Sequence, residues 1–223
     1  REWNEWKFYD REGRLMEQAD FRMGERHGHV RIYHPNGQVQ HDGWFRFGKE
    51  DSLRVSRYSD GDIMESGSYK NGIKMGEWRY YNPDSVPLLV EVCTDSIVQI
   101  REAWDRDGKQ TVLDGNGTMH SYFASGADME EYTIHNGLKD GPCAEFHPAG
   151  NPKAKGGYRN GAKHGPWSYW YSNNKLEKKD AFVDGKLQGP YELWFKSGQL
   201  NIQGHHHAGL KDSVWTWYTT LGK

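Results

Sequence analysis

The sequence predicts an all-β fold: an elongated single-layer antiparallel sheet of about nine tandem β-hairpin repeats of about 24 residues each. Three observations support this prediction. A glycine-anchored pattern recurs along the chain, short aromatic segments alternate with turn signals, and aliphatic residues are scarce although aromatic residues make up 14%. A chain with few aliphatic side chains cannot fill a thick two-layer core, but rings that each bury about 150–250 Å² can cover a thin sheet.

The repeat is measured from an anchor residue that recurs every 24 residues in each of two runs. The anchors are Gly28, Ser52, Gly76, Gly117, Gly141, Gly165, Gly189 and Ser213. Ring or apolar residues predominate two, five and seventeen positions after the anchor, and glycine predominates nine and twenty positions after it. Because five columns stay in step, the chain is interpreted as a repeat protein.

One repeat has the pattern of a β-hairpin. Aromatic stretches such as "PWSYWY" (166–171) alternate as strands do, and a following glycine suits a short loop that needs positive φ. The return strand carries an aliphatic residue, often a glycine about four positions later, and a ring two positions beyond that, all on one face. Asn-Gly or Asp-Gly, as at 71–72 and 184–185, closes the repeat. Successive hairpins are therefore expected to pair edge to edge.

The organisation of the chain is interpreted as one continuous array over residues 1–223. The repeat loses its register at about 82–116, where the units shorten, and we expect a shortened hairpin in this segment. A junction between two repeat arrays is the alternative explanation.

Charge and composition narrow the function classes. Lys and Arg (29) nearly balance Asp and Glu (31), so the formal net charge of −2 gives no attraction to nucleic acid or to an anionic bilayer. We therefore predict no nucleic-acid partner and no membrane-lipid partner. The sequence has no signal or transmembrane segment, but it begins at Arg1, so earlier removal of an export signal is allowed and the localisation stays open.

Motifs for chemistry are absent from the sequence: no catalytic triad order, phosphate loop or zinc-ligand spacing occurs. We therefore predict a protein that is not an enzyme and needs no cofactor. His205 and His207 are weak candidates for a metal pair, with His206 in the ring column, but two ligands fall short of a specific site, so no metal is predicted. His27 and His164 each precede an anchor glycine.

The C-terminal repeats carry more rings than packing requires, so a binding surface is predicted there. The candidate binding residues are Trp167, Tyr169, Trp170, Trp194, Phe195, Trp215 and Trp217. Cys143 occupies a column that holds tryptophan in other repeats, and we interpret it as a small hydrophobic residue.

Strings such as "GEWRYY" (76–81) and "GSYKNGIKMG" (67–76) resemble the bacterial variant of the MORN repeat, over nearly the whole chain apart from its centre. The resemblance implies a β-hairpin array, and it implies that His27 and His164 are part of the turns. Bacterial proteins of this type are commonly described as the antitoxin component of a YwqK-type toxin–antitoxin system, which implies a toxin as partner. The pattern is broken where Ser52 and Ser213 replace the anchor glycine and where Arg57 replaces a tyrosine.

Two function classes fit these observations. The first is a non-catalytic repeat scaffold that binds another protein, with toxin neutralisation as the form that the resemblance implies. The second is a cell-wall or glycan-binding module that stacks exposed rings on sugars. The scaffold is our principal prediction and glycan binding is the alternative, while the partner's identity and the oligomeric state stay open.

Overall fold

The structure is a computed structural model that describes residues 4–220, and over this range the chain is all-β, without a helix. The predicted fold class is therefore confirmed. The chain forms two compact units, one ending at Leu113 and one beginning at Asp114. None of the described residues belongs to a helix that could span a membrane.

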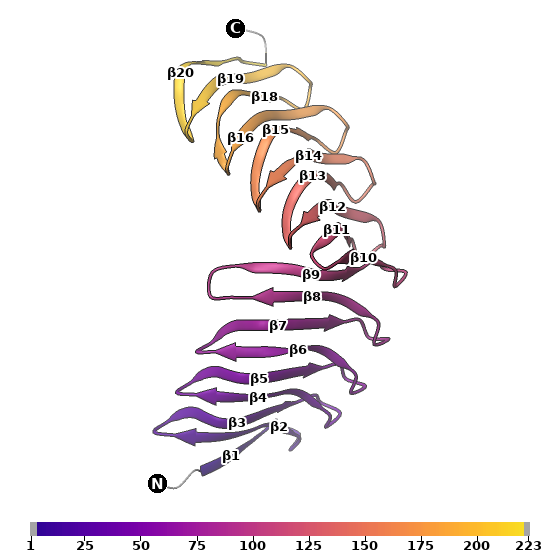
Figure 1. The fold of residues 1–223 in the computed structure, drawn as a ribbon, viewed down its shortest axis with the longest axis vertical. Helices are drawn as coiled ribbons and strands as arrows, with labels where there is room; N and C mark the ends of the chain where they lie inside the picture. The colour runs from indigo at the N-terminus through magenta and orange to yellow at the C-terminus, as the bar shows by residue number, and fades with distance from the viewer. Residues whose placement is uncertain (1–3, 221–223) are drawn as a thin grey trace. The chain divides into compact units, whose positions relative to one another are not determined.

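The first unit is an antiparallel meander. Its strands are β1 (Asn4–Tyr9), β2 (Leu15–Arg22), β3 (Glu25–Tyr33), β4 (Val39–Arg46), β5 (Lys49–Arg57), β6 (Ile63–Lys70), β7 (Ile73–Tyr81), β8 (Pro87–Cys93), β9 (Val98–Trp104) and β10 (Gln110–Leu113). Each strand pairs with the next along the chain, as Figure 1 shows. The irregular segment at 82–116 therefore still forms strands, and the description of the whole chain as one continuous array stays a prediction.

The second unit repeats this arrangement. Its strands are β11 (Asn116–Tyr122), β12 (Asp128–His135), β13 (Leu138–Phe146), β14 (Pro152–Arg159), β15 (Ala162–Trp170), β16 (Leu176–Val183), β17 (Lys186–Leu187), β18 (Gly189–Trp194), β19 (Leu200–His207) and β20 (Leu210–Trp217). Consecutive strands are again antiparallel, and β16 pairs with both β17 and β18. Gln188 separates β17 from β18, which together fill one strand position.

The anchor residues mark a β-bulge in the hairpins. All eight anchors have positive φ, from 61° at Ser213 to 144° at Gly117. In β7, three residues (76–78) lie opposite the single residue Gly67 of β6. Such a bulge bends the strand and increases its local twist. Glycine is favoured at the anchor because positive φ costs a residue with a side chain about 1–2 kcal/mol.

The turns between hairpins also bond successive repeats. Asn160 and Gly161 have φ values of 49° and 82°, which fits the type I′ turn that connects two-residue hairpins. The Gly161 amide donates a hydrogen bond to the Lys139 carbonyl of the preceding repeat at 2.8 Å. Gly185 makes the equivalent bond to Lys163 at 2.9 Å. Each turn is therefore held to the repeat before it.

At the opposite ends of the hairpins, where the loops lie, side chains form the hydrogen bonds between successive repeats. The Tyr58 hydroxyl donates to the Tyr81 carbonyl at 2.9 Å, and the Tyr171 hydroxyl donates to the Trp194 carbonyl at 2.7 Å. Each of these bonds joins one repeat to the following one. The hairpins are consequently tied to their neighbours at both ends, in addition to the ladder between strands.

In each unit an indole ring covers a glycine on one face of the sheet. Trp78 and Trp167 are 0% and 1% exposed. A Cβ atom built on Gly67 would lie 2.2 Å from the Trp78 ring, and one on Gly156 would lie 2.2 Å from the Trp167 ring. The Trp78 Nε1 also donates to the Ser68 carbonyl at 3.1 Å, and Trp167 makes the equivalent bond. The indole ring therefore packs directly against the backbone of the glycine in the return strand.

Hairpins without tryptophan fill the same space differently. Val30 pairs with Ala19, and the two side chains are 3% and 1% exposed. Tyr132 pairs with Cys143, so the large residue stands on the return strand and the small one on the forward strand. Cys143 is buried and outside any disulfide, and burial raises the pKa of its thiol to about 11. These properties support its interpretation as a small hydrophobic residue.

Candidate functional site

Lysine side chains lie over the packed rings. They stand two positions before the anchor, on the strand that carries the ring two positions after it. The ammonium-to-centroid distances are 4.0 Å for Lys74–Trp78, 3.7 Å for Lys163–Trp167 and 4.4 Å for Lys211–Trp215. A cation over a ring face is attracted by the ring quadrupole. Each of these indoles is therefore in contact with a cation of its own chain.

A buried carboxylate interrupts the glycine column in the second unit. Asp180 is 4% exposed and pairs with Trp167 across β15 and β16. Its Oδ2 atom lies 2.7 Å from Lys178 Nζ, and Lys178 lies 4.0 Å from the centroid of the Tyr169 ring. Burial raises the pKa of the Tyr169 hydroxyl, and Asp180 raises it further. The sequence signal for Asp180 is its place in a column that holds glycine in neighbouring hairpins.

The ring-face members of the predicted binding set differ in exposure. Trp167 is 1% exposed, so it contributes to packing and offers no surface to a partner. Tyr169 stacks against it, with ring centroids 5.9 Å apart. Trp217 is 59% exposed, and its ring centroid lies 6.4 Å from that of Trp215. The structure thus brings together the pairs Trp167–Tyr169 and Trp215–Trp217.

The other members of the predicted set lie at strand ends. Trp170 and Trp194 are the last residues of β15 and β18, and both are half-buried. The Trp170 carbonyl accepts a hydrogen bond from His147 Nε2 at 2.9 Å. Phe195 follows in the loop, where its amide donates to the Gln199 carbonyl at 2.9 Å. These three aromatic residues therefore help to form the hairpin ends, and their role in binding stays a prediction.

Further apolar side chains accompany the exposed tryptophan on β20. Leu210 and Val214 are 75% and 82% exposed. The described strand pairings connect β20 to β19 alone, so its other edge is unpaired within this part of the chain. Leu210 and Val214 lie on the opposite side of β20 from Trp215 and Trp217, because side chains alternate along a strand. We name the apolar residues on both sides of this outer strand, Leu210, Val214, Trp215 and Trp217, the C-terminal apolar patch. Sequence reasoning missed its aliphatic members, although an outer strand of a repeat array has no neighbour to cover it.

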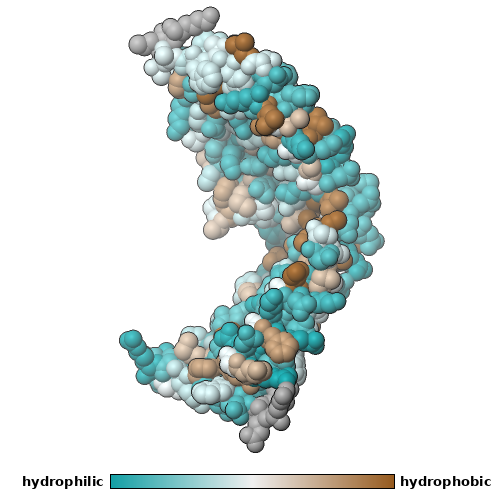
Figure 2. Space-filling view, turned by 90° about the vertical axis from the view of Figure 1, so that its left-hand side faces the viewer, coloured by the Kyte–Doolittle hydropathy of each residue, from teal (hydrophilic) through white to brown (hydrophobic). Residues whose placement is uncertain are grey.

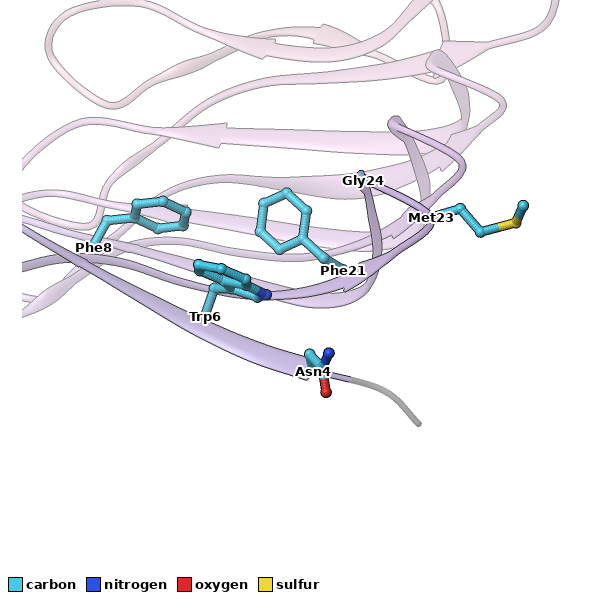
Figure 3. A pocket seen from close by; sticks show the side chains of 6 residues that line it. All are labelled: Asn4, Trp6, Phe8, Phe21, Met23 and Gly24. Atoms are coloured by element: carbon cyan, nitrogen blue, oxygen red, sulfur yellow. The ribbon is translucent and has the colours of Figure 1, made fainter. Parts of the chain in front are cut away.

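A second apolar surface lies at β1. Trp6 and Phe8 are 54% and 43% exposed, and each makes an edge contact with Phe21 of β2. Figure 3 shows these three rings on the same side of the two strands. Together with Asn4, Met23 and Gly24 they line a hollow of about 360 Å³.

Elsewhere the visible surface is mostly polar. Figure 2 shows apolar residues scattered in small groups over a largely hydrophilic face. Charged residues also form ion pairs on the surface of the protein, as where Arg101 Nη1 lies 2.7 Å from Glu77 Oε2. Scattered apolar residues of this kind are normal on a protein surface.

A polar cluster replaces the packed rings at one place in the first unit. Arg54 stands where other hairpins have tryptophan, beside a cavity of about 210 Å³. His41 Nδ1 lies 2.9 Å from Ser56 Oγ, which donates to Glu65 Oε1 at 3.0 Å. In a catalytic triad the histidine lies between hydroxyl and carboxylate, whereas here the hydroxyl lies between them and Ser56 is 0% exposed. The cluster therefore offers no activated nucleophile.

The consecutive histidines alternate in environment. His206 is 7% exposed and contacts the rings of Tyr191 and Trp215, at centroid distances of 5.4 and 4.9 Å. Burial lowers the pKa of its imidazole. His207 is exposed, and His205 is half-buried. Within residues 4–220, no group of three or more His, Cys, Asp or Glu side chains is placed to hold a metal ion.

The two histidines that precede anchor glycines contact the neighbouring turns. His27 Nδ1 accepts a hydrogen bond from the Phe47 amide at 3.3 Å. His164 Nδ1 lies 3.6 Å from Asp184 Oδ1 in the next turn. These contacts support the interpretation of both residues as part of the turn structure.

Comparison with known proteins gives a family model and weak structural likenesses. No curated protein matches the chain. Among solved structures, TcdB2-TccC3 without its hypervariable C-terminal region is similar at 12% identity, covering 90% of this chain and 11% of that chain, with a TM-score of 0.26. TcdB2-TccC3-TEV is similar at 12% identity, covering 96% of this chain and 15% of that chain, with a TM-score of 0.25. This chain therefore spans 11–15% of the length of these structures.

The family model is described as the MORN repeat variant. It matches residues 26–43, in β3 and β4, and residues 163–184, in β15 and β16. Both matches cover a forward strand, a hairpin loop and a return strand. The MORN repeat variant is thus present at two places of an antiparallel hairpin array, once in each compact unit.

Proposed function

We propose that this chain is a non-catalytic repeat scaffold that binds a partner protein through the C-terminal apolar patch. The exposure of Trp217 carries this proposal: it is 59% exposed on an unpaired strand edge, whereas Trp78 and Trp167 are 0% and 1% exposed. Tryptophan surrounded by apolar neighbours is a frequent anchor of protein interfaces. Trp215 supplies such a neighbour, with its ring centroid 6.4 Å from that of Trp217. Leu210 and Val214 add exposed apolar surface on the other side of the same strand.

The remainder of the array supports a scaffold role. Hydrogen bonds join successive repeats at the turns and at the loop ends, as at Gly161 and Tyr171. A surface held by such bonds changes little when it binds, which lowers the entropy lost on association. The presence of MORN repeat variants is consistent with this role.

The lysines over the rings favour a protein partner over a glycan. A sugar binds an aromatic residue by covering its ring face. Lys211 Nζ lies 4.4 Å from the Trp215 centroid and 5.5 Å from the Trp217 centroid. A sugar at these rings would have to displace the ammonium group and its cation–π contact. Glycan binding is therefore the second candidate.

Site-specific photo-crosslinking tests the proposal. A photoreactive phenylalanine derivative is placed at position 217 in one sample and at position 44 in another. Trp44 is a matched control because it is 53% exposed on the interior strand β4. The proposal predicts that position 217 forms one discrete protein adduct in extracts of the source cells and that position 44 does not.

The purified partner then allows a quantitative test. Trp217→Ala should weaken its binding at least about thirtyfold, as truncation of an interface anchor does, while Trp44→Ala should leave it unchanged. Equal affinity of both variants would contradict the proposal. Binding of purified peptidoglycan fragments that Trp217→Ala abolishes would support the glycan alternative. The toxin-neutralising form of the proposal requires that co-expression of this chain relieves growth inhibition by the partner.

A further inference from the structure

The outer edge of β1 is free to pair within the part of the chain that the structure describes. Its recorded ladder connects β1 to β2 alone. Trp6 and Phe8 project from β1 beside Phe21, and the hollow of about 360 Å³ opens next to them (Figure 3). An unpaired strand with exposed apolar residues is a template for the addition of another strand.

The charges of β1 are arranged symmetrically about Trp6. Glu5 precedes Trp6 and Lys7 follows it, and both charged side chains lie on the opposite side of the sheet from the indole. They are 51% and 46% exposed, and Lys7 Nζ lies 3.7 Å from Glu5 Oε2. Two copies of such a strand in antiparallel register about Trp6 would place each glutamate opposite a lysine of the other copy.

We propose that two copies of this chain associate through their β1 strands, which pair antiparallel about Trp6. In this register Trp6 lies opposite Trp6 of the second copy, and Phe8 lies opposite Asn4. Glu5 of each copy faces Lys7 of the other, which forms two ion pairs across the junction. The apolar sides of both copies then lie on the same side of the joined sheet, so the exposed rings cover one another.

Other registers fit this strand less well. A shift of one residue would place Trp6 beside Lys7 of the second copy and bring the apolar side of one copy next to the polar side of the other. Pairing centred on Lys7 would bring two lysines together, and pairing centred on Glu5 would bring two carboxylates together. A lysine on a free edge discourages pairing unless an opposite charge meets it. Glu5 supplies that charge in the register centred on Trp6.

Sedimentation equilibrium of the full chain tests the proposal. The unmodified chain should show a dimer of twice 25.8 kDa that dissociates on dilution. Glu5→Lys and Lys7→Glu should each raise the dissociation constant at least about tenfold, because like charges then lie opposite each other. An equimolar mixture of the two variants should form a heterodimer, because opposite charges face each other again.

The controls separate this interface from other surfaces. Lys153→Glu changes a side chain that is 56% exposed on the interior strand β14, and it should leave the dimer unchanged. A chain that is monomeric at all concentrations would overturn the proposal, and so would a dimer that neither β1 variant weakens. A dimer lost in Trp217→Ala and kept in Lys7→Glu would place self-association at the C-terminal apolar patch and also overturn it. Circular dichroism of each variant shows whether the strands are intact.

Discussion

Replacing Gly156 by alanine puts a methyl group where the Trp167 ring lies. The new Cβ would lie 2.2, 2.3 and 2.6 Å from Cδ2, Cε2 and Cγ of the indole. Carbon atoms in contact normally stay about 3.5–4.0 Å apart, and this Cβ is fixed to the backbone of β14. The indole therefore has to leave its position and give up its hydrogen bond to the Gly157 carbonyl.

The expected loss of stability follows from the burial of Trp167, which is 1% exposed. A tryptophan that buries about 150–250 Å² contributes about 4–6 kcal/mol at 25 cal/mol per Å². Part of this area stays covered if the displaced ring lies on the sheet surface. We therefore expect Gly156→Ala to lower the free energy of unfolding by about 3–5 kcal/mol, similar to the cost of removing a buried aromatic residue.

Gly43 provides a matched control in the same column. Its nearest neighbours to an added Cβ are Arg54 Cβ and the Leu53 carbonyl, both at 3.7 Å, and its φ is outside the left-handed region. Gly43→Ala should therefore be neutral or stabilise the fold by up to about 1 kcal/mol through the unfolded state. Urea unfolding followed by far-UV circular dichroism gives the free energy of unfolding of both variants, and this signal does not depend on the fluorescence of the indole.

A double-mutant cycle sharpens this test. Trp167→Ala should cost about as much as Gly156→Ala, and the double variant should cost little more than either, because the two changes remove the same contact. A difference of less than about 1 kcal/mol between Gly156→Ala and Gly43→Ala would refute the reasoning. Strict additivity in the cycle would refute it as well.

Three other predictions concern the remaining irregular positions of the repeat. Ser52→Gly and Ser213→Gly should each stabilise the fold by about 1 kcal/mol, since the φ values of 75° and 61° strain a side chain; a lower thermal midpoint in both would contradict this. The double variant Glu50→Lys with Arg54→Trp should fill the cavity of about 210 Å³, rebuild the lysine-over-tryptophan unit and raise the thermal midpoint. Free quenching of the fluorescence of the new indole by iodide would contradict this prediction, because a ring that fills the cavity is shielded from the solvent. Burial lowers the pKa of His206 from 6.5, so as the pH falls through 6.5 the unfolded chain takes up the proton first and stability declines. In urea titrations His206→Phe should reduce this decline, and an unchanged slope would contradict the assignment.

The hairpin repeat could be predicted from the sequence because its columns carry strong local signals. The sequence predicted the glycines of the hairpin loops and closing turns, but it could not distinguish the bulge at the anchor from the glycine beneath an indole. Gly61 occupies a hairpin loop, Gly76 forms a bulge with φ of 70°, and Gly67 lies beneath the Trp78 ring. These roles depend on pairing between strands, which a single strand does not reveal. Arg54 at a tryptophan position and Ser52 at an anchor show where the repeat tolerates other residues.

The sequence could predict that aromatic residues form the candidate binding site, but it could not predict which of them are exposed. Trp167 and Trp217 both occur in aromatic C-terminal strands, yet they are 1% and 59% exposed. Their burial depends on which strands cover them and on whether a glycine in the adjacent strand leaves room for the ring. Leu210 and Val214 were overlooked because single aliphatic residues carry no periodic signal. Ile73, at the position equivalent to Leu210 on the interior strand β7, is also 51% exposed, so this column faces solvent in other repeats too.

The central claim is that Trp78 and Trp167, which cover glycines on interior strands, hold the array together while the tryptophans of the outer strands remain available to partners. Hydroxyl-radical footprinting with mass spectrometry measures the oxidation rate of each tryptophan in the folded chain. Trp78 and Trp167 should be protected, and Trp6 and Trp217 should be oxidised at least about tenfold faster, in line with exposures of 0%, 1%, 54% and 59%. Oxidation of Trp78 or Trp167 at the rate of Trp217 would contradict the account.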